Sequence, residues 1–477
     1  MVGFRTLSRC PMPLRLLPLL LLALLMAGDA AAQPDVRADG FTRLYGAGRV
    51  DLDTPAQEAD YLALLSRSEL GLRADYDRGA LRIRLRADVD GLAPYSTPDA
   101  DAPSSDGAPG DERLDLRVLE AYADVFFDRV DLRVGRQVFV WGETDGAFIT
   151  DVLAPLDLTR FLAQDAADLR LGLTAVRATA YLGEITADAV LVPRAAPSLL
   201  PARRSPWDPI PRDVTGVPVA LEAPTLPDAT LGNGELALRL TWGGIDRTDL
   251  ALILYTGHNR LPAFDKRLRF SFADGLRATL TPVYRRRQTV GMTLETARLE
   301  PFVLRAEAAY TRGDLFDESL ALPDPITPGD LFDPDLVDAA ARGFLLEKSS
   351  VQAAVGAERF FGKHLVRLTG LGKAVLRWDR RVAERRFAPS ASVLYAAPFR
   401  RETVQVRAFG LIGTEGDYWL SPSVAYTVSD ALALTAGAHV FGGAASDDNA
   451  ALLGDASFSF GLYDRNDLVF LQLQYGF

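Results

Sequence analysis

Hydrophobic and polar residues alternate along residues 80–91, which read ALRIRLRADVDG. Apolar side chains occupy one parity, and Arg82, Arg84 and Arg86 occupy the other. A period of two predicts a β-strand, because successive side chains of a strand point to opposite faces. The preceding run alternates in the same way, and the short segment DRG separates the two. The pattern therefore predicts a β-hairpin with one oily face and one arginine-rich face.

The same alternation recurs over most of the chain. Clear examples are LALRLTW at 236–242, RLRFSF at 267–272, FVLRAEAAY at 302–310 and TVQVRAF at 403–409. Short turns separate many of these runs, and long polar segments separate others. Short turns at one rim and long loops at the other are typical of outer-membrane barrels. We therefore expect an all-β fold, a closed antiparallel transmembrane β-barrel of about 16 strands (range of about 14 to 18), with long extracellular loops.

One break in the alternation predicts a local irregularity. In the run RLDLRVLEAYADVFF, Leu116 and Val118 share one parity, whereas Leu119 and Ala121 share the other. A single extra residue in one strand produces such a switch. The pattern therefore predicts a β-bulge between Val118 and Leu119.

The first residues have the pattern of an export signal. Three arginines precede a short apolar run, LLPLLLLALLMAG, and three alanines follow it. This order predicts a secretory signal peptide over residues 1–32, cleaved after Ala32, and a mature barrel over residues 33–477. The single cysteine, Cys10, precedes the apolar run. The mature chain is therefore expected to have no thiol ligand and no disulfide.

Charge and hydropathy limit the classes of partner. The full chain carries a net charge of −11. Without the three arginines and one aspartate of the leader, 49 basic and 62 acidic residues remain, a net charge of −13. This sign disfavours binding to nucleic acid. No stretch after the leader is apolar for the roughly 18 residues that a membrane-spanning helix needs.

The last strand pattern, DLVFLQLQYGF, places Leu473, Tyr475 and Phe477 on one parity. A terminal phenylalanine with an aromatic residue two positions earlier resembles the assembly signal of Gram-negative outer-membrane barrels. The resemblance implies a place in the outer membrane of a Gram-negative bacterium. It also implies the barrel-assembly machinery, outer-membrane lipid and lipopolysaccharide as partners.

If the apolar parity faces lipid, the opposite parity faces the lumen. The arginines that we expect to line the pore are Arg73, Arg82, Arg84, Arg86, Arg133, Arg239, Arg267, Arg269, Arg305 and Arg407. Acidic residues such as Asp75, Asp88 and Glu307 share these faces. Two interpretations stay open. In the first, the arginines make the pore selective for anions, as rings of arginine do in other pores. In the second, the arginines pair with the acids in a structural network across the strands.

Residues 135–162, GRQVFVWGETDGAFITDVLAPLDLTRFL, do not continue the alternation after Trp141. The segment is too apolar for a solvated loop, and the interior of a barrel is the place where its side chains can be buried. Its charged residues are Glu143, Asp145, Asp151, Asp157 and Arg160. We expect the segment to fold into the lumen and to narrow it, with these residues bound to arginines of the wall.

The motif GRQ…WG…D…L.P.D, with the later run VLVPRAAPSLLPARRSPW, resembles a group of poorly characterised Gram-negative outer-membrane barrels that are porin-like. The resemblance covers roughly residues 132–207, and the chain departs from it at residues 153–155, where Asn-Pro is more usual. It implies an outer-membrane porin or substrate channel for the passive passage of small solutes, with an unidentified solute. The arginines suggest that such a channel prefers anions.

The sequence leaves three other classes of function to consider. The apolar inward segment is compatible with an internal hatch in a transporter of hydrophobic molecules, or in a partner for lipid export. A barrel with a filled lumen suits an anchor or adhesin. An outer-membrane hydrolase is disfavoured, because the chain has three histidines, His258, His364 and His439, and the run TGHNR lacks the order of an outer-membrane phospholipase site. We expect no enzyme activity, no cofactor and no metal site.

Overall fold

The computed structural model describes residues 34–50, 62–90, 114–144, 148–201, 205–210, 213–214, 217–228, 230–271, 275–319, 329, 332–443 and 460–477. The predicted signal peptide lies outside these residues. Within them, no helix is both long enough and apolar enough to span a bilayer.

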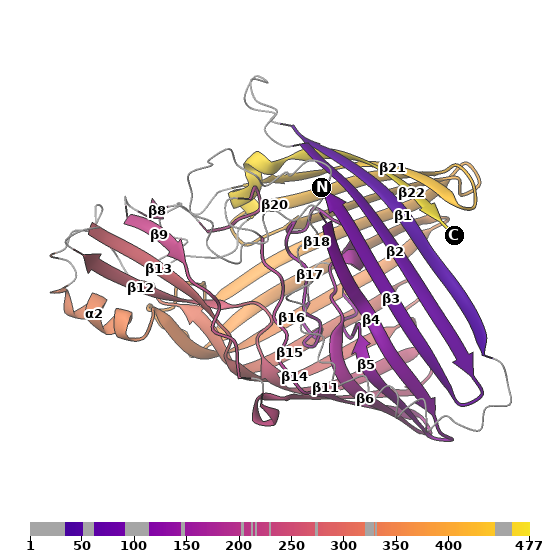
Figure 1. Ribbon diagram of the computed structural model, residues 1–477, viewed down its shortest axis with the longest axis horizontal. Helices are drawn as coiled ribbons and strands as arrows, with labels where there is room; N and C mark the ends of the chain where they lie inside the picture. The colour runs from indigo at the N-terminus through magenta and orange to yellow at the C-terminus, as the bar shows by residue number, and fades with distance from the viewer. Residues whose placement is uncertain are drawn as a thin grey trace, which may run out of the picture.

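Within the described residues, 18 strands form one antiparallel sheet (Figure 1). In order around the sheet they are β1 (Asp35–Arg49), β2 (Leu62–Tyr76), β3 (Gly79–Asp90), β4 (Leu114–Phe126), β5 (Val130–Gln137), β6 (Leu173–Leu182), β7 (Ile185–Val192), β10 (Glu235–Ile245), β11 (Thr248–His258), β14 (Arg286–Thr296), β15 (Val303–Asp317), β16 (Leu345–Phe361), β17 (His364–Leu376), β18 (Phe387–Phe399), β19 (Val404–Ile412), β20 (Tyr418–Thr427), β21 (Leu432–Gly442) and β22 (Leu468–Gly476). The sheet closes because β1 pairs with both β2 and β22.

The closed antiparallel barrel is the predicted fold class. The favoured number of about 16 strands is too low, because the ring contains 18, the upper limit of the predicted range. Strands such as β18, FAPSASVLYAAPF, are rich in alanine, serine and proline. Such strands carry side chains of similar size on both faces. This weakens the alternation of hydrophobic and polar residues by which a strand is recognised in a sequence.

A second, four-stranded sheet lies beyond one end of the ring, at the left of Figure 1. It contains β8 (Asp213–Val214), β9 (Val217–Leu221), β12 (Ala263–Ser271) and β13 (Gly275–Val283), and helix α2 (Pro334–Ala341) packs against β12 through Leu268. Arg267 and Arg269 lie on β12. The prediction that they stand on the barrel wall is therefore wrong, since alternation marks any two-faced strand, inside or outside a barrel.

The connections divide the barrel into two ends. The turn between β2 and β3 is short, whereas β5 and β6 are joined by residues 138–172. We call the two rims the short-turn end and the long-loop end. The second sheet belongs to the long-loop end, and the chain finishes at the short-turn end.

Short 3₁₀ helices occur in the long connections, namely η2 (Ala166–Asp168), η3 (Leu231–Asn233) and η5 (Phe460–Asn466).

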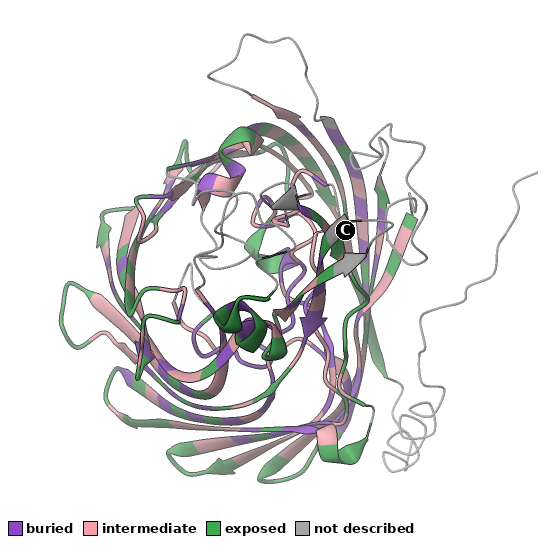
Figure 2. Ribbon diagram, turned by 90° about the vertical axis from the view of Figure 1, so that its left-hand side faces the viewer, coloured by how far each residue is buried: buried purple, intermediate pink, exposed green. Residues whose placement is uncertain are grey.

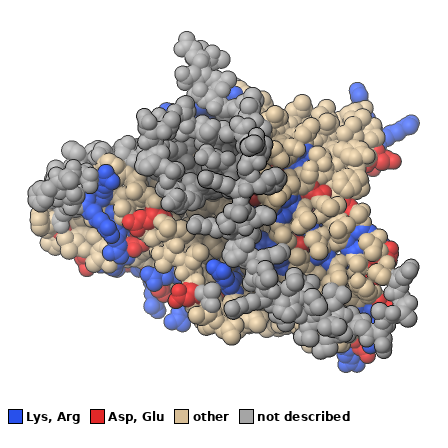
Figure 3. Space-filling view, viewed as in Figure 1, with Lys and Arg blue, Asp and Glu red and all other residues tan. Residues whose placement is uncertain are grey.

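The outer face of the ring is apolar. Large hydrophobic side chains that are exposed on the strands include Leu72, Ile83, Leu85, Leu254, Val290, Val355, Leu368, Leu420, Leu471, Leu473 and Tyr475. Over β21 and β22, at the upper right of Figure 3, few charged side chains interrupt this surface. A closed sheet pairs its backbone groups internally, so such a face is suited to contact with lipid.

The predicted β-bulge is confirmed. Arg84 on β3 faces Glu120 on β4, but the next residue, Leu85, faces Val118. Leu119 is therefore the extra residue, and its side chain is buried. The bulge exchanges the parity of β4, so that Glu120 and Asp124 reach arginines inside the ring.

Candidate functional site in the lumen

The interior of the ring is occupied by chain rather than empty. Seen from the left of Figure 1, the strands enclose several connecting segments (Figure 2). We call the described part of the β5–β6 connection, residues 138–144 and 148–172, the lumenal segment. It begins slightly later than predicted because β5 continues to Gln137. Its residues Val152 and Leu153 are 3% and 1% exposed and pack with Trp141, Ile253 and other apolar side chains.

One end of the lumenal segment is bound to Glu307 on β15. The Glu307 carboxylate accepts hydrogen bonds from the Glu143 amide at 2.6 Å and from the hydroxyl groups of Thr144 at 2.8 Å and Thr150 at 2.6 Å. Arg239 on β10 donates to the Glu143 carboxylate at 3.0 Å. Glu307 is 2% exposed, so these bonds satisfy a buried charge.

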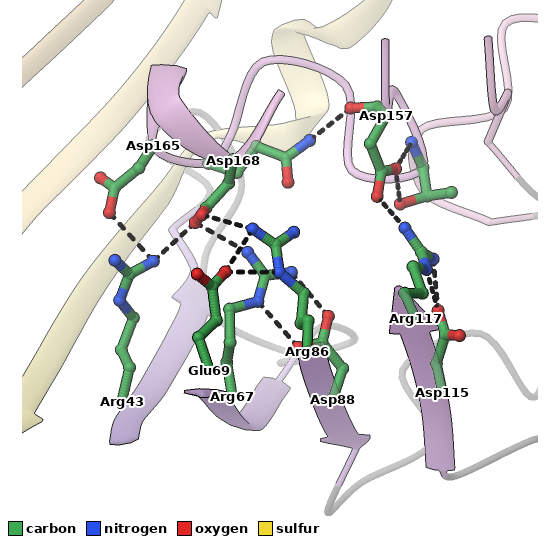
Figure 4. Close-up of polar contacts among 12 residues, drawn as sticks. Arg43, Arg67, Glu69, Arg86, Asp88, Asp115, Arg117, Asp157, Asp165 and Asp168 are labelled. Carbon is green, nitrogen blue, oxygen red and sulfur yellow. Dashed lines mark hydrogen bonds and ion pairs between the residues drawn. The ribbon is translucent and has the colours of Figure 1, made fainter. Parts of the chain in front are cut away.

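The other end of the segment is bound to three arginines. Asp168, on η2, lies 2.6 Å from Arg43 on β1, 2.7 Å from Arg67 on β2 and 2.9 Å from Arg86 on β3 (Figure 4). We call these four residues the Asp168 cluster. Within the wall, Arg67 also pairs with Asp88 at 2.6 Å, and Arg86 donates to Glu69 at 2.7 Å.

Charge pairing sets the protonation of the cluster. Burial acts to raise the pKa of Asp168, but the positive charges of Arg67, Arg43 and Arg86 outweigh it and hold the pKa below its ordinary value. The carboxylate therefore stays ionised at neutral pH. Asp168 is 5% exposed, and a buried carboxylate needs such partners to remain charged.

The two attachments lie on opposite sides of the barrel. Counted around the ring from β1, β2 is the second strand and β15 the eleventh, so nine of 18 steps separate them. The lumenal segment thus crosses the lumen from Glu307 to the Asp168 cluster. Asp151 braces it internally through Arg170 at 2.6 Å and the Trp141 amide at 2.7 Å.

The remaining charged residues of the predicted constriction divide into three cases. Asp157 pairs with Arg117 on β4, and this pair lies beside the Asp168 cluster in Figure 4. Arg160 lines a cavity next to the lumenal segment. Asp145 lies outside the described residues.

Most of the predicted pore arginines on the wall carry an acidic partner. The pairs are Arg73 with Asp75, Arg82 with Glu120, Arg84 with Asp39 and Glu120, Arg86 with Glu69 and Asp168, Arg133 with Asp124, Arg239 with Glu143, and Arg305 with Glu295 and Glu358. Arg407 differs, since it makes no ion pair with any residue that the structure describes, and its side chain is exposed to the cavity.

The cavity has a volume of about 240 Å³ and lies between the lumenal segment and the wall of β1, β2 and β19–β22. Five aromatic side chains on adjacent strands form one side of it. They are Phe409 (β19), Trp419 (β20), His439 (β21), Phe470 (β22) and Tyr45 (β1), and we call this row the aromatic shelf. Neighbouring ring centroids lie 5.2, 6.0, 5.4 and 5.6 Å apart along the row.

The aromatic shelf is not among the features predicted from the sequence. The sequence nevertheless contains a signal for it. Each of these aromatic residues occupies a lumen-facing position of its strand, where barrel strands normally carry polar residues. Phe470, for example, shares its face with Gln472 and Gln474, while Leu471 and Leu473 face outward.

The three histidines lie in separate places. His258 lies 3.5 Å from Glu235, His364 contacts the hydroxyl of Tyr395 at 2.8 Å, and His439 belongs to the aromatic shelf. Among the described residues, no group of three or more potential metal ligands is present.

Comparison with known proteins supports the fold. A family model described as "Protein of unknown function (DUF1302)" matches residues 68–343. No curated protein matches the sequence. The solved structure of Acinetobacter baumannii OccAB1 aligns with a TM-score of 0.54 at 11% identity, covering 94% of this chain and 98% of that one.

Two further solved structures give similar values. Acinetobacter baumannii OccAB4 aligns with a TM-score of 0.51 at 11% identity, and Pseudomonas aeruginosa OccK2 (OpdF), in complex with glucuronate, with 0.51 at 12%. Each comparison covers 93% of this chain and 98% of the other. At these identities the likeness is one of fold, and the residues of the predicted GRQ motif remain a prediction.

Proposed function

Since the chain belongs to DUF1302, a family described as proteins of unknown function, we propose its function from its own geometry: it is an outer-membrane porin or substrate channel for the passive passage of small solutes. The observation that carries the proposal is a closed barrel whose lumen is crossed by a segment fixed at both sides, by Glu307 and by Asp168. Because the lumenal segment is held by buried contacts at both ends, it narrows the lumen in a fixed position. The fold shared with OccAB1 supports the same conclusion.

The proposed location is the outer membrane of a Gram-negative bacterium, with lipid and lipopolysaccharide around the apolar face. Insertion there would need the barrel-assembly machinery. Leu473 and Tyr475 of the proposed assembly signal face outward on β22, and Phe477 follows them.

A preference for anions is part of the proposal, and the structure changes which residue supports it. Arg82, Arg84 and Arg86 face acids, which neutralise much of their field. Arg407 has no such partner among the described residues and lines the cavity. An uncompensated guanidinium in a narrow lumen attracts anions more strongly than on an open surface.

Reversal potentials of the purified protein in planar bilayers under a KCl gradient test this proposal. We expect chloride to be preferred, and Arg407→Gln to reduce the preference while Arg269→Gln, outside the barrel, leaves it unchanged. A preference for potassium in the wild type, or the same ratio in both variants, would contradict the role of Arg407.

Transport of hydrophobic molecules remains the second candidate, because the aromatic shelf provides apolar surface inside the lumen. Lipid co-purifying with the protein after extensive detergent exchange would favour this candidate over the channel for small solutes.

A further inference from the structure

The aromatic shelf is an apolar surface on one side of the cavity. Its rings come from five consecutive strands of the closed ring, and the widest centroid spacing in the row is 6.0 Å. Such spacing leaves the rings in continuous contact. Aromatic rings, through a face or an edge, pair with other rings in offset-stacked or edge-to-face geometry and gain energy beyond the burial of area.

A polar band follows the shelf in the direction of the short-turn end. On β19, Arg407 comes two residues before Phe409, which places their Cα atoms roughly 6.5–7 Å apart along the strand. On β20, Ser421 and Ser423 follow Trp419 by two and four residues in the same direction, and all of these residues line the cavity. The cavity therefore has an aromatic half and a polar half within the length of one small molecule.

Charge within the polar half is available on one arginine in particular. Arg43 and Arg67 also line the cavity, but both are engaged by acids. Arg43 pairs with Asp168 and Asp165, and Arg67 pairs with Asp168 and Asp88. Arg407 makes no ion pair with the described residues, so its donor fork is open to an incoming carboxylate.

We propose that this cavity binds a small organic anion with a planar apolar body, its ring on the aromatic shelf and its acid group on Arg407. The proposal rests on the proposed channel function and specifies the class of solute. The order of the two halves orients the solute with its acid group toward the short-turn end. A volume of about 240 Å³ lies below the roughly 300–1,000 Å³ of pockets for larger ligands, which favours a compact ring compound over a lipid.

Calorimetric titration of the detergent-solubilised protein with three probes tests the proposal. 2-Naphthoate carries ring and acid, 2-naphthylmethanol carries the ring alone, and acetate carries the acid alone. We expect 2-naphthoate to bind at least about tenfold more tightly than either of the others, because it alone uses both halves of the cavity.

Matched variants separate the two halves. Arg407→Gln should weaken 2-naphthoate about tenfold, to the level of 2-naphthylmethanol, whose own binding should not change. Trp419→Leu should weaken both ring compounds. Arg269→Gln removes an exposed arginine on β12, outside the ring, and should have no effect. Retention of heat-modifiable migration shows that each variant is folded.

Two results would overturn the proposal. One is wild-type protein that binds 2-naphthoate no better than 2-naphthylmethanol or acetate, a comparison that needs no variant. The other is a folded Arg407→Gln protein with unchanged affinity for 2-naphthoate. Bilayer recordings of the same preparation keep the two proposals apart, since binding without conductance rejects the channel alone, and conductance without binding rejects this site alone.

Discussion

Asp168 Oδ1 lies 2.9 Å from Arg86 Nη2, which joins the chain inside the lumen to the third strand of the barrel wall. Both residues are buried, at 5% and 4% exposure. A buried carboxylate that meets three guanidinium groups is stable only while all of its partners stay in place. The contact therefore fixes the position of η2, and with it one end of the lumenal segment.

Replacing Asp168 with asparagine should release this end of the segment. The change leaves three arginines without their shared acid, and breaking a buried pair costs on the order of 3–5 kcal/mol. We expect a larger and noisier single-channel conductance, and unfolding of the heat-modifiable form at a lower temperature. Asp165→Asn is the matched control, because Asp165 pairs with Arg43 but its side chain is 51% exposed, so it should behave as wild type.

Acid should release the segment only at low pH. The pKa of Asp168 is below its ordinary value of 3.8, since the charges of the three arginines outweigh the effect of burial. A carboxyl with a lowered pKa stabilises the folded form above its ordinary pKa, and this contribution is lost as the pH falls through the lowered value. Conductance should stay constant from pH 7 to pH 5 and rise below about pH 3.8. A rise between pH 7 and pH 5 would show that another group controls the segment.

Deleting residues 144–162 should widen the passage. The deletion removes the threonine hydroxyls that bind Glu307 and most of the chain that crosses the lumen. If the barrel still assembles, we expect single-channel conductance to increase severalfold. A folded deletion protein with wild-type conductance would place the segment outside the conducting path.

Changing Phe477 to aspartate should slow assembly of the barrel in cells. The Phe477 amide and carbonyl pair with the backbone of Gly40 at 3.0 and 3.1 Å, where β22 meets β1. A Cβ at position 40 would lie 2.7 Å from the Phe477 ring, so glycine makes room for that ring. Pulse-chase measurement of heat-modifiable protein checks this, with Tyr475→Phe as a control that keeps an aromatic side chain. Equal rates for both variants would show that the terminal residue is not part of a signal.

The barrel itself was predictable from the sequence, because adjacent residues of a strand face lipid and lumen in turn. Lipid favours apolar side chains and the lumen favours polar ones. The alternation in β3 and the parity switch at Leu119 each follow from this rule, and both are found. The same rule fails for Arg267 on β12, because a strand exposed to solvent alternates as well. The alternation of hydrophobic and polar residues alone does not show which sheet a strand belongs to.

The partners of the lumenal charges were not predictable, because they depend on how the long connection folds. Asp168 lies beyond the predicted segment, yet it is the residue that gathers Arg43, Arg67 and Arg86. Nothing in the alternation of single strands indicates that these three side chains converge. The aromatic shelf is a similar case, since its five residues are far apart in the sequence and adjacent only once β1 closes on β22.

The central claim is that a closed barrel with a fixed lumenal segment conducts small solutes, and single-channel recording of the purified wild-type protein in a planar bilayer tests it most directly. We predict discrete conductance steps that become larger in Asp168→Asn and stay unchanged in Asp165→Asn. Folded, heat-modifiable protein that gives no current steps in any of the three forms would contradict the claim and indicate a barrel that is filled rather than open.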